Sequence, residues 1–313
     1  MWLFNHKILV RESGLLEGFR DCHCHLLPGV DDGVKDLEDT LLILGDWEIA
    51  GVKEVWMTPH IMEDIPNRPE VLLRKFEQVK AAYGGGVKLH LAAEHMLDGL
   101  FLKRIDVGEV MAFDGLPFNK NKNKDKDKNE DSGEGTAGLY KKKDKDKNKD
   151  SGAVERQRQI QKQKSLTPDP SPEGEGSENE KVEVDVGVDV DKGGKLLVET
   201  SYYTPPMNMG GIMEDIMKRG YEPILAHPER YQYMDVKDYK RWKNMGVMLQ
   251  LNVPSVVGAY GPEVQRKAEW LLKENMYDFC GTDTHSVEQV GLLLNSLISK
   301  KTVKRIQAIP NEL

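Results

Sequence analysis

Short apolar runs alternate along this chain with longer segments in which apolar residues recur at helical spacing. The runs have the length of buried strands, and several are rich in β-branched residues. Seven of them are strand candidates, at about residues 19–24, 53–58, 87–93, 195–199, 221–226, 247–252 and 277–282. Strands that alternate with helices are joined by right-handed crossovers and lie parallel. The pattern therefore predicts an α/β fold built on parallel strands.

Helical periodicity marks several of the connecting segments. Four sets of residues carry it: Leu37, Leu41, Leu44 and Glu48; Val71, Phe76, Val79 and Lys80; Ile212, Ile216 and Met217; and Val264, Ala268, Leu271 and Leu272. We expect Asn208 to be the N-cap of the third helix, because its side chain can accept a hydrogen bond from a free backbone N–H. Pro262 suits the first turn of the fourth helix, where its missing N–H costs little.

Residues 119–194 interrupt this pattern. The motif Lys-Asp-Lys-Asp-Lys-Asn at 124–129 recurs at 143–148, and each copy continues toward Asp-Ser-Gly. Opposite charges nearly cancel and large apolar side chains are almost absent, so burial cannot offset the entropy of ordering the chain. We predict a disordered insertion between a first part of the fold at 1–118 and a second part at 195–313. A regulatory or docking arm is the alternative.

Composition narrows the class of protein. The chain has 313 residues and 39% hydrophobic content, enough for a sizeable core. Its net charge of −8 argues against nucleic acid or anionic lipid as a partner. Three cysteines make no disulfide framework, which favours a reducing compartment. No apolar run approaches the ~20 residues of a membrane span, and the N-terminus lacks a secretory pattern. We therefore predict a cytoplasmic protein without membrane insertion, and the oligomeric state stays open.

Six of the seven runs end on residue types that bind metals. These residues are His23 and His25, His60, Glu94, Glu199, His227, and Asp283 with His285. In an open parallel sheet, ligands converge only near a switch point, whereas a barrel collects them at one rim from strand after strand. Without the insertion 237 residues remain, close to the ~250 of one such barrel. The pattern therefore favours a barrel.

The first of these runs carries two imidazoles two residues apart. Residues two apart in a strand share a face, so Asp21, His23 and His25 should point one way and Cys22 and Cys24 the other. Two imidazoles on one face make half of a metal site, although the pair alone is equally compatible with polar surface. We interpret the two cysteines as packing thiols, with a metal-binding role as the alternative.

The mixture of ligand types indicates which metals to expect. Imidazole and carboxylate without thiolate suit Mn²⁺, Fe or Zn. The candidates exceed the needs of one ion, so we expect two or three ions that share a bridging carboxylate. Clusters of this kind lower the pKa of bound water and stabilise the attacking and leaving oxygens of phosphoryl transfer.

The motifs also resemble a known family. The run Asp21–His25 followed by Pro28–Gly33 is similar to the first motif of the PHP (polymerase and histidinol phosphatase) superfamily. Six later motifs resemble the bacterial PHP-type tyrosine-protein phosphatases of capsule and exopolysaccharide loci: Thr58-Pro59-His60, Ala93-Glu94, Val198-Glu199-Thr200-Ser201, Ala226-His227-Pro228-Glu229-Arg230-Tyr231, Gln250-Leu251-Asn252 and Gly281-Thr282-Asp283-Thr284-His285. The resemblance extends over the chain apart from residues 119–194 and about the first fifteen.

The resemblance implies a distorted seven-stranded (β/α) barrel with a trinuclear, usually manganese-dependent site. Matched by motif, the ligands would be His23, His25, Glu94 and Asp283 for the first ion, Glu94, Glu199 and His227 for the second, and Asp32, His60 and His285 for the third. Glu94 would bridge the first two ions. Asp31 is the alternative to Asp32, and the Asp-Asp-Gly loop is also compatible with a simple turn.

Two further expectations follow from the resemblance. Arg230 would bind the substrate phosphate through its planar guanidinium, and a surface ion pair with Glu229 or another neighbour is the alternative. The insertion lies where the family has a short connection. Because it precedes the strand that ends on Glu199, it puts the placement of that ligand at risk.

The implied activity is that of a metal-dependent protein-tyrosine phosphatase, with a hydroxide held by the ions as nucleophile. The expected partner is a phosphotyrosine protein, a membrane-anchored tyrosine autokinase of polysaccharide synthesis. The alternatives are a small-molecule phosphatase of the histidinol-phosphate type and a non-catalytic metal-binding scaffold. A nuclease is disfavoured by the acidic charge and the absence of a basic stripe beside the ligands.

Overall fold

A computed structural model describes residues 7–113 and 193–313. The first range contains β1 (Lys7–Leu9), β2 (Arg20–Cys24), α1 (Leu37–Ala50), β3 (Glu54–Met57), β4 (His60–Ile61), α2 (Pro69–Ala82), β5 (Lys88–Leu91), β6 (Glu94–Met96) and α3 (Phe101–Val107). The second contains β7 (Lys195–Glu199), α4 (Met209–Lys218), β8 (Glu222–Ala226), the 3-10 helix η3 (Pro228–Arg230), α5 (Val236–Met245), β9 (Met248–Asn252), α6 (Val253–Val256), α7 (Pro262–Lys273), β10 (Phe279–Gly281), α8 (Val287–Leu294), β11 (Leu297–Ser299) and α9 (Lys300–Ile306). Apart from its last two residues, the predicted insertion at 119–194 lies outside these ranges.

The seven predicted strands are present, with one systematic difference. β2, β7, β8, β9 and β10 lie within the predicted runs, and β7 has the expected bounds. The runs at 53–58 and 87–93 form β3 and β5, and each is followed after a short break by a second strand, β4 or β6. The first break falls at Thr58-Pro59, where proline has no N–H to donate to a ladder.

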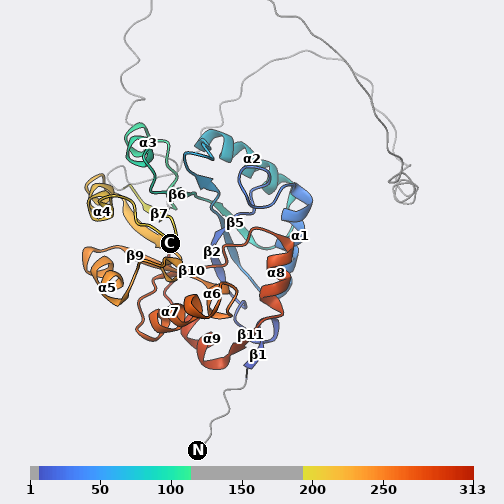
Figure 1. The fold of residues 1–313 in the computed structure, drawn as a ribbon. Helices are drawn as coiled ribbons and strands as arrows, with labels where there is room; N and C mark the ends of the chain where they lie inside the picture. Colours follow the sequence, from blue (N-terminus) through green and yellow to red (C-terminus); the bar gives the residue numbers. More distant parts are fainter. Residues whose placement is uncertain (1–6, 114–192) are drawn as a thin grey trace, which may run out of the picture. The chain divides into compact units, whose positions relative to one another are not determined.

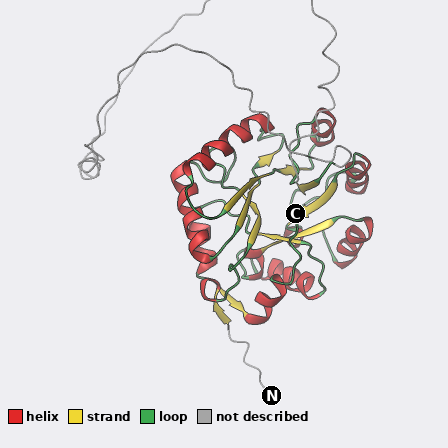
Figure 2. Ribbon diagram, turned by 180° about the vertical axis from the view of Figure 1, so that it is seen from behind, coloured by secondary structure: helices red, strands yellow, loops and turns green. Residues whose placement is uncertain are grey.

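The parallel strands form two sheets with helices around them (Figures 1 and 2). One has the order β10-β9-β8-β7-β6-β4 and the other the order β2-β3-β5, and β1 pairs antiparallel with β11. A parallel bridge between Cys24 and Thr284 connects the sheets beyond β10. The parallel α/β prediction is confirmed. The described parallel strands make two sheets, however, and no closed barrel, because the ladders are interrupted at the two breaks.

The helices test the capping predictions. α1, α2, α4 and α7 occupy the predicted segments, and Pro262 stands in the first turn of α7. Asn208 does precede α4, but the predicted side-chain cap is wrong, because Asn208 has left-handed backbone with φ 57° and makes no capping hydrogen bond. The periodicity did not reveal α5, although Asp235 and Asp238 form a reciprocal capping box there. No helix in the described ranges is long and apolar enough to cross a membrane.

β2 departs from strict alternation. Its register against β3 shifts between Asp21 and Cys24, which inserts one extra residue as a β-bulge does. Cys22 consequently packs in a small apolar cluster with Trp56 and Phe279, whereas Cys24 packs in the larger core. Both are buried thiols as interpreted, but the prediction that they share a face is wrong.

Candidate metal centre

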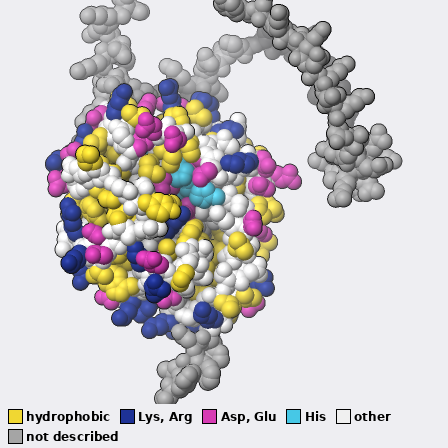
Figure 3. Space-filling view, viewed as in Figure 1, with side chains coloured by type: hydrophobic (Ala, Val, Ile, Leu, Met, Phe, Trp, Pro, Cys, Tyr) yellow, Lys and Arg dark blue, Asp and Glu magenta, His cyan; other side chains and the backbone are white. Residues whose placement is uncertain are grey.

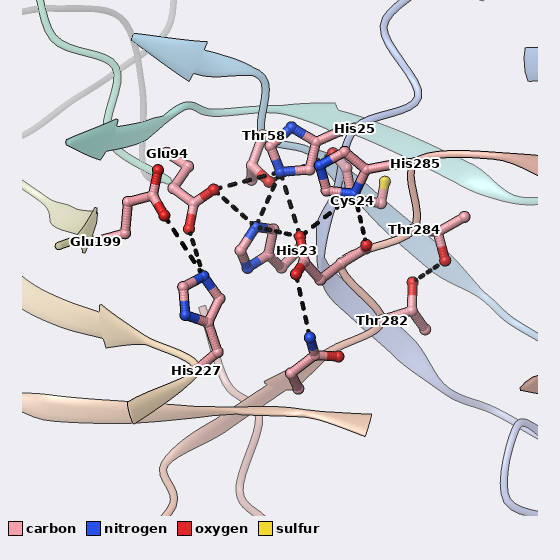
Figure 4. A network of polar contacts seen from close by, with 12 residues as sticks. His23, Cys24, His25, Thr58, Glu94, Glu199, His227, Thr282, Thr284 and His285 are labelled. Atoms are coloured by element: carbon pink, nitrogen blue, oxygen red, sulfur yellow. Dashed lines mark hydrogen bonds and ion pairs between the residues drawn. The ribbon is translucent and has the colours of Figure 1, made fainter. Parts of the chain in front are cut away.

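The predicted ligands gather where the parallel strands end. His23 lies in β2 and His25 follows it, His60 and Glu94 open the short strands after the two breaks, Glu199 ends β7, His227 follows β8, and Asp283 and His285 follow β10. Because the strands are parallel, these ends lie on one side of the sheets. Figure 4 shows the side chains converging. The insertion has not displaced Glu199, which is buried within this group.

Glu94 lies in the middle of the group (Figure 4). Its Oε2 is 3.2 Å from Nε2 of His23 and 3.3 Å from both Nε2 of His25 and Nδ1 of His60. Its Oε1 is 3.1 Å from Nε2 of His227. The two carboxylate oxygens thus face different imidazoles, which is the arrangement that a bridging carboxylate requires.

Three groups of side chains offer ligand atoms within 4.8 Å of one another. They are His23, His25, Glu94 and Asp283; His60, Glu94 and Glu199; and His25, Asp32, His60 and His285. The first has the four residues expected for the first ion. In the second, His60 takes the place expected for His227, whose Nε2 lies 3.8 Å from Oε2 of Glu199. All nine predicted ligands come together, and their division among ions stays a prediction.

His60 connects the second and third groups. Its Nδ1 is 3.1 Å from Oε1 of Glu199, and its Nε2 is 3.5 Å from Oδ1 of Asp32. The two ring nitrogens therefore face carboxylates that belong to different groups. A neutral imidazole has a lone pair on only one ring nitrogen, so only one of these contacts can become a metal bond in that state.

Three of the imidazoles are oriented by hydrogen bonds at Nδ1. The Nδ1 of His23 lies 2.7 Å from Oε1 of Gln250, and that of His285 lies 2.8 Å from the Asp283 carbonyl oxygen. The Nδ1 of His25 lies 2.8 Å from Oδ2 of Asp31. Since each partner is an acceptor, Nδ1 carries the proton when the ring is neutral, and Nε2 keeps its lone pair for an ion.

The structure separates the roles of the two neighbouring aspartates. Besides its bond to His25, the buried carboxylate of Asp31 accepts from the backbone N–H groups of Gly33 and His60, at 3.0 Å each. Asp32 is 65% exposed, and its Oδ1 lies 3.6 Å from Nε2 of His285. Asp31 therefore orients the His25 imidazole and holds the loop, while Asp32 belongs to a group that could hold an ion.

The donor set fits divalent cations. The buried Nδ1 of His60 and Oε1 of Glu199 face each other, and neither has a hydrogen-bond partner in the described part of the chain. Burial opposes ionisation of Glu94, yet His23 and the other imidazoles hold the pKa of Glu94 well below its usual range. Burial likewise opposes charge on His23, but Glu94 and Asp283 raise the pKa of His23 to about 9. The carboxylates thus attract positive charge, which protons or metal ions can supply.

Two of the predicted ligands have unusual backbone conformations. His227 and Asp283 lie in the left-handed region, with φ 33° and 52°. Such conformations are costly for non-glycine residues and persist where the surroundings enforce them, often at functional sites. Nearby, a Cβ added to Gly281 would lie 2.5 Å from Cβ of His23. Glycine is therefore needed for β10 to approach β2 so closely.

Seven of the nine predicted ligands, all except His23 and His25, line a cavity of about 500 Å³ that also contains Arg230. Figure 3 shows histidine and acidic side chains gathered in a hollow of the surface. Arg230 is 16% exposed, and its Nη1 lies 2.6 Å from Oδ2 of Asp283. The alternative of a surface pair with Glu229 is wrong, because Glu229 is buried and accepts a hydrogen bond from the Tyr277 hydroxyl at 2.9 Å.

Comparisons with known proteins agree with this geometry. Residues 19–116 and 178–301 match the family described as capsular polysaccharide synthesis, CpsB/CapC. The chain belongs to this family. Its relative CapC of Staphylococcus aureus, whose name assigns it provisionally to the tyrosine-protein phosphatases, is 26% identical over 113 residues, or 35% of this chain and 44% of CapC. The match thus spans less than half the length of that relative.

The fold is also found among solved structures. A chain from the crystal structures of YwqE from Bacillus subtilis and CpsB from Streptococcus pneumoniae, described as metal-dependent tyrosine phosphatases, is similar with a TM-score of 0.58. The similarity covers 94% of this chain and 89% of that chain at 15% sequence identity. At this identity the comparison shows the shared CpsB/CapC fold alone.

Residues that support the ligands were not predicted in this CpsB/CapC chain. Besides its bond to His23, Gln250 donates its Nε2–H to the Cys22 carbonyl at 3.2 Å, and Asn252 donates to Oδ2 of Asp283 at 3.1 Å. Both lie in β9, which corresponds to the one predicted run of the seven that does not end on a metal-type residue. Their motif was visible in the sequence, but only their contacts with His23, Cys22 and Asp283 reveal their roles.

We expect Asp31→Asn to weaken metal binding by about 10- to 100-fold, because an amide replaces one of two oxygens that both accept hydrogen bonds. The measurement is a titration of metal-free protein with Mn²⁺ by calorimetry. Asp64→Asn, at an exposed position in the loop after β4, is the control and should bind as the unmodified protein does. Unchanged affinity in Asp31→Asn would remove the orienting role.

Proposed function

We propose that this protein is a metal-dependent protein-tyrosine phosphatase of capsule or exopolysaccharide synthesis. The observation that carries the proposal is the position of Glu94, whose two oxygens face separate imidazole groups at the base of a cavity that also holds Arg230. A multinuclear centre beside a guanidinium suits a phosphate monoester. The cavity volume of about 500 Å³ is ample for a phosphotyrosine side chain.

The residues around the cavity would have different roles in the reaction. The carboxylates and imidazoles would hold the ions, which when bound supply positive charge to phosphoryl oxygens and lower the pKa of water. Arg230 would bind the phosphate through the edge of its guanidinium that does not contact Asp283. The departing phenol has a pKa near 10, so it leaves more readily than an aliphatic alcohol and needs less help from a general acid.

The names of related proteins support the finer parts of the proposal. YwqE and CpsB are described as metal-dependent tyrosine phosphatases, and the family is one of capsular polysaccharide synthesis. We propose Mn²⁺ as the metal, with Fe or Zn as alternatives, a membrane-anchored tyrosine autokinase as the partner, and the cytoplasm as the location. We also propose that the two sheets correspond to an interrupted seven-stranded barrel, which the bridge from Cys24 to Thr284 supports.

The test is phosphate release by the full chain, first stripped of metal with a chelator and then supplied with Mn²⁺, Fe²⁺ or Zn²⁺. We expect a phosphotyrosine peptide to be hydrolysed only after metal is added. Hydrolysis of histidinol phosphate but not of the peptide would favour the small-molecule phosphatase instead. Metal binding without hydrolysis of either substrate would indicate a scaffold.

A further inference from the structure

Two tyrosines in the cavity wall contact Arg230 from different loops. Cζ of Arg230 lies 4.4 Å from the ring centroid of Tyr202, which follows β7, and 4.3 Å from that of Tyr260, between α6 and α7. All three residues line the cavity. An aromatic face within about 6 Å attracts a guanidinium, so each ring stabilises the same cation.

Further contacts hold each tyrosine in place. The Tyr202 ring stacks on that of Tyr231 with centroids 6.1 Å apart, and Tyr231 is fully buried. The hydroxyl of Tyr260 accepts a hydrogen bond of 3.2 Å from Nδ2 of Asn252. Asn252 also donates to Asp283, the carboxylate that pairs with Arg230. Each ring is therefore anchored independently of the arginine.

The third contact fixes one nitrogen of Arg230. Its Nη1 binds Oδ2 of Asp283, whose Oδ1 lies 3.3 Å from Nε2 of His23. The guanidinium is thereby restrained by two rings and one carboxylate. Within residues 7–113 and 193–313, its remaining N–H groups have no hydrogen-bond partner and can bind a ligand in the cavity. A flexible arginine loses side-chain entropy when it binds an anion, and a restrained one has already lost it.

We propose that Tyr202 and Tyr260 are positioning residues that hold Arg230 ready to bind the phosphate group of the substrate. This inference rests on the proposed function for its substrate, but phosphate binding alone can test it. The two tyrosines act through the arginine, so they should matter only while the arginine is present.

The experiment measures binding of inorganic phosphate to the Mn²⁺-loaded full chain by calorimetry, and kcat and KM on a phosphotyrosine peptide. We expect Tyr202→Leu and Tyr260→Leu each to weaken phosphate binding about tenfold and to raise KM more than they lower kcat, with metal content unchanged. Tyr202→Phe retains the ring and should stay within about twofold of the unmodified protein. Tyr203→Leu, at a 71% exposed neighbour, is the control and should change neither quantity.

A double-mutant cycle decides whether the tyrosines act through Arg230. In an Arg230→Ala background, Tyr202→Leu and Tyr260→Leu should cause no further loss of phosphate affinity. Equal losses with and without the arginine would overturn the proposal, as would full affinity in both leucine variants. If the leucine variants change phosphate affinity as expected but the unmodified protein hydrolyses no phosphotyrosine peptide, the proposed function fails while the positioning role stands.

Discussion

Glu94→Gln should lower phosphotyrosine hydrolysis by at least about 10³-fold, equivalent to ~4 kcal/mol of transition-state stabilisation. The reason is the central place of this carboxylate. Its Oε2 faces His23, His25 and His60, and its Oε1 faces His227. Glutamine has nearly the same shape but no negative charge and only one acceptor oxygen, so it cannot bridge two cations.

The measurement combines steady-state kinetics with metal analysis of the purified protein. We expect Glu94→Gln to contain less metal than the unmodified protein and to remain folded, as judged by thermal unfolding. Glu229→Gln is the matched control, because Glu229 is also fully buried but belongs to none of the three ligand groups. It should keep its metal. Normal metal content and near-normal turnover in Glu94→Gln would contradict the multinuclear centre.

The strand-end ligands were predictable because one simple rule connects them. In parallel strands the carboxyl ends share one side, so residues at the ends of successive runs must meet whatever lies between them. This is why Glu94 and Glu199 come together although about a hundred residues separate them. The order of the strands along the chain was sufficient, and no knowledge of side-chain packing was needed.

Local irregularities were not predictable in the same way. The bulge in β2 places Cys22 and Cys24 in different apolar clusters. A prediction from strict alternation assumes that the strand contains no extra residue, and a bulge breaks that assumption. Asn208 is of a residue type that is common at N-caps, but its backbone is left-handed. In both cases the backbone of the folded chain differs from the one that the sequence pattern predicts.

The residues that support the site have no signature of their own in the sequence. Tyr202 and Tyr260 lie in separate loops and carry no periodic pattern, and their meaning appears only once both rings lie against Arg230. Asp31 and Asp32 are adjacent and chemically identical, and only the fold distinguishes the orienting carboxylate from the exposed one. Such roles depend on contacts between distant segments, which spacing along the chain does not encode.

Arg230→Lys should lower kcat/KM for a phosphotyrosine peptide by about 10²-fold while metal content stays unchanged. Lysine keeps the positive charge and can still pair with Asp283, so the buried carboxylate is not left without a partner. It lacks the planar fork, however, and cannot offer two parallel N–H groups to a phosphate while it contacts Asp283. The loss should therefore fall on substrate binding and transition-state stabilisation, and not on folding.

Arg219→Lys provides the comparison, because Arg219 is also paired with an aspartate, Asp106, at 2.8 Å, but lies at the surface between α4 and β8. Replacement there should change kcat/KM by less than about twofold, because Arg219 lies outside the cavity and exposed ion pairs contribute little to folding stability. Equal activity of Arg230→Lys and the unmodified protein would reduce Arg230 to a counter-ion of Asp283. A parallel loss of metal and activity would instead mean that Arg230 stabilises the ligand group itself, because Asp283 is shared between the guanidinium and the imidazoles.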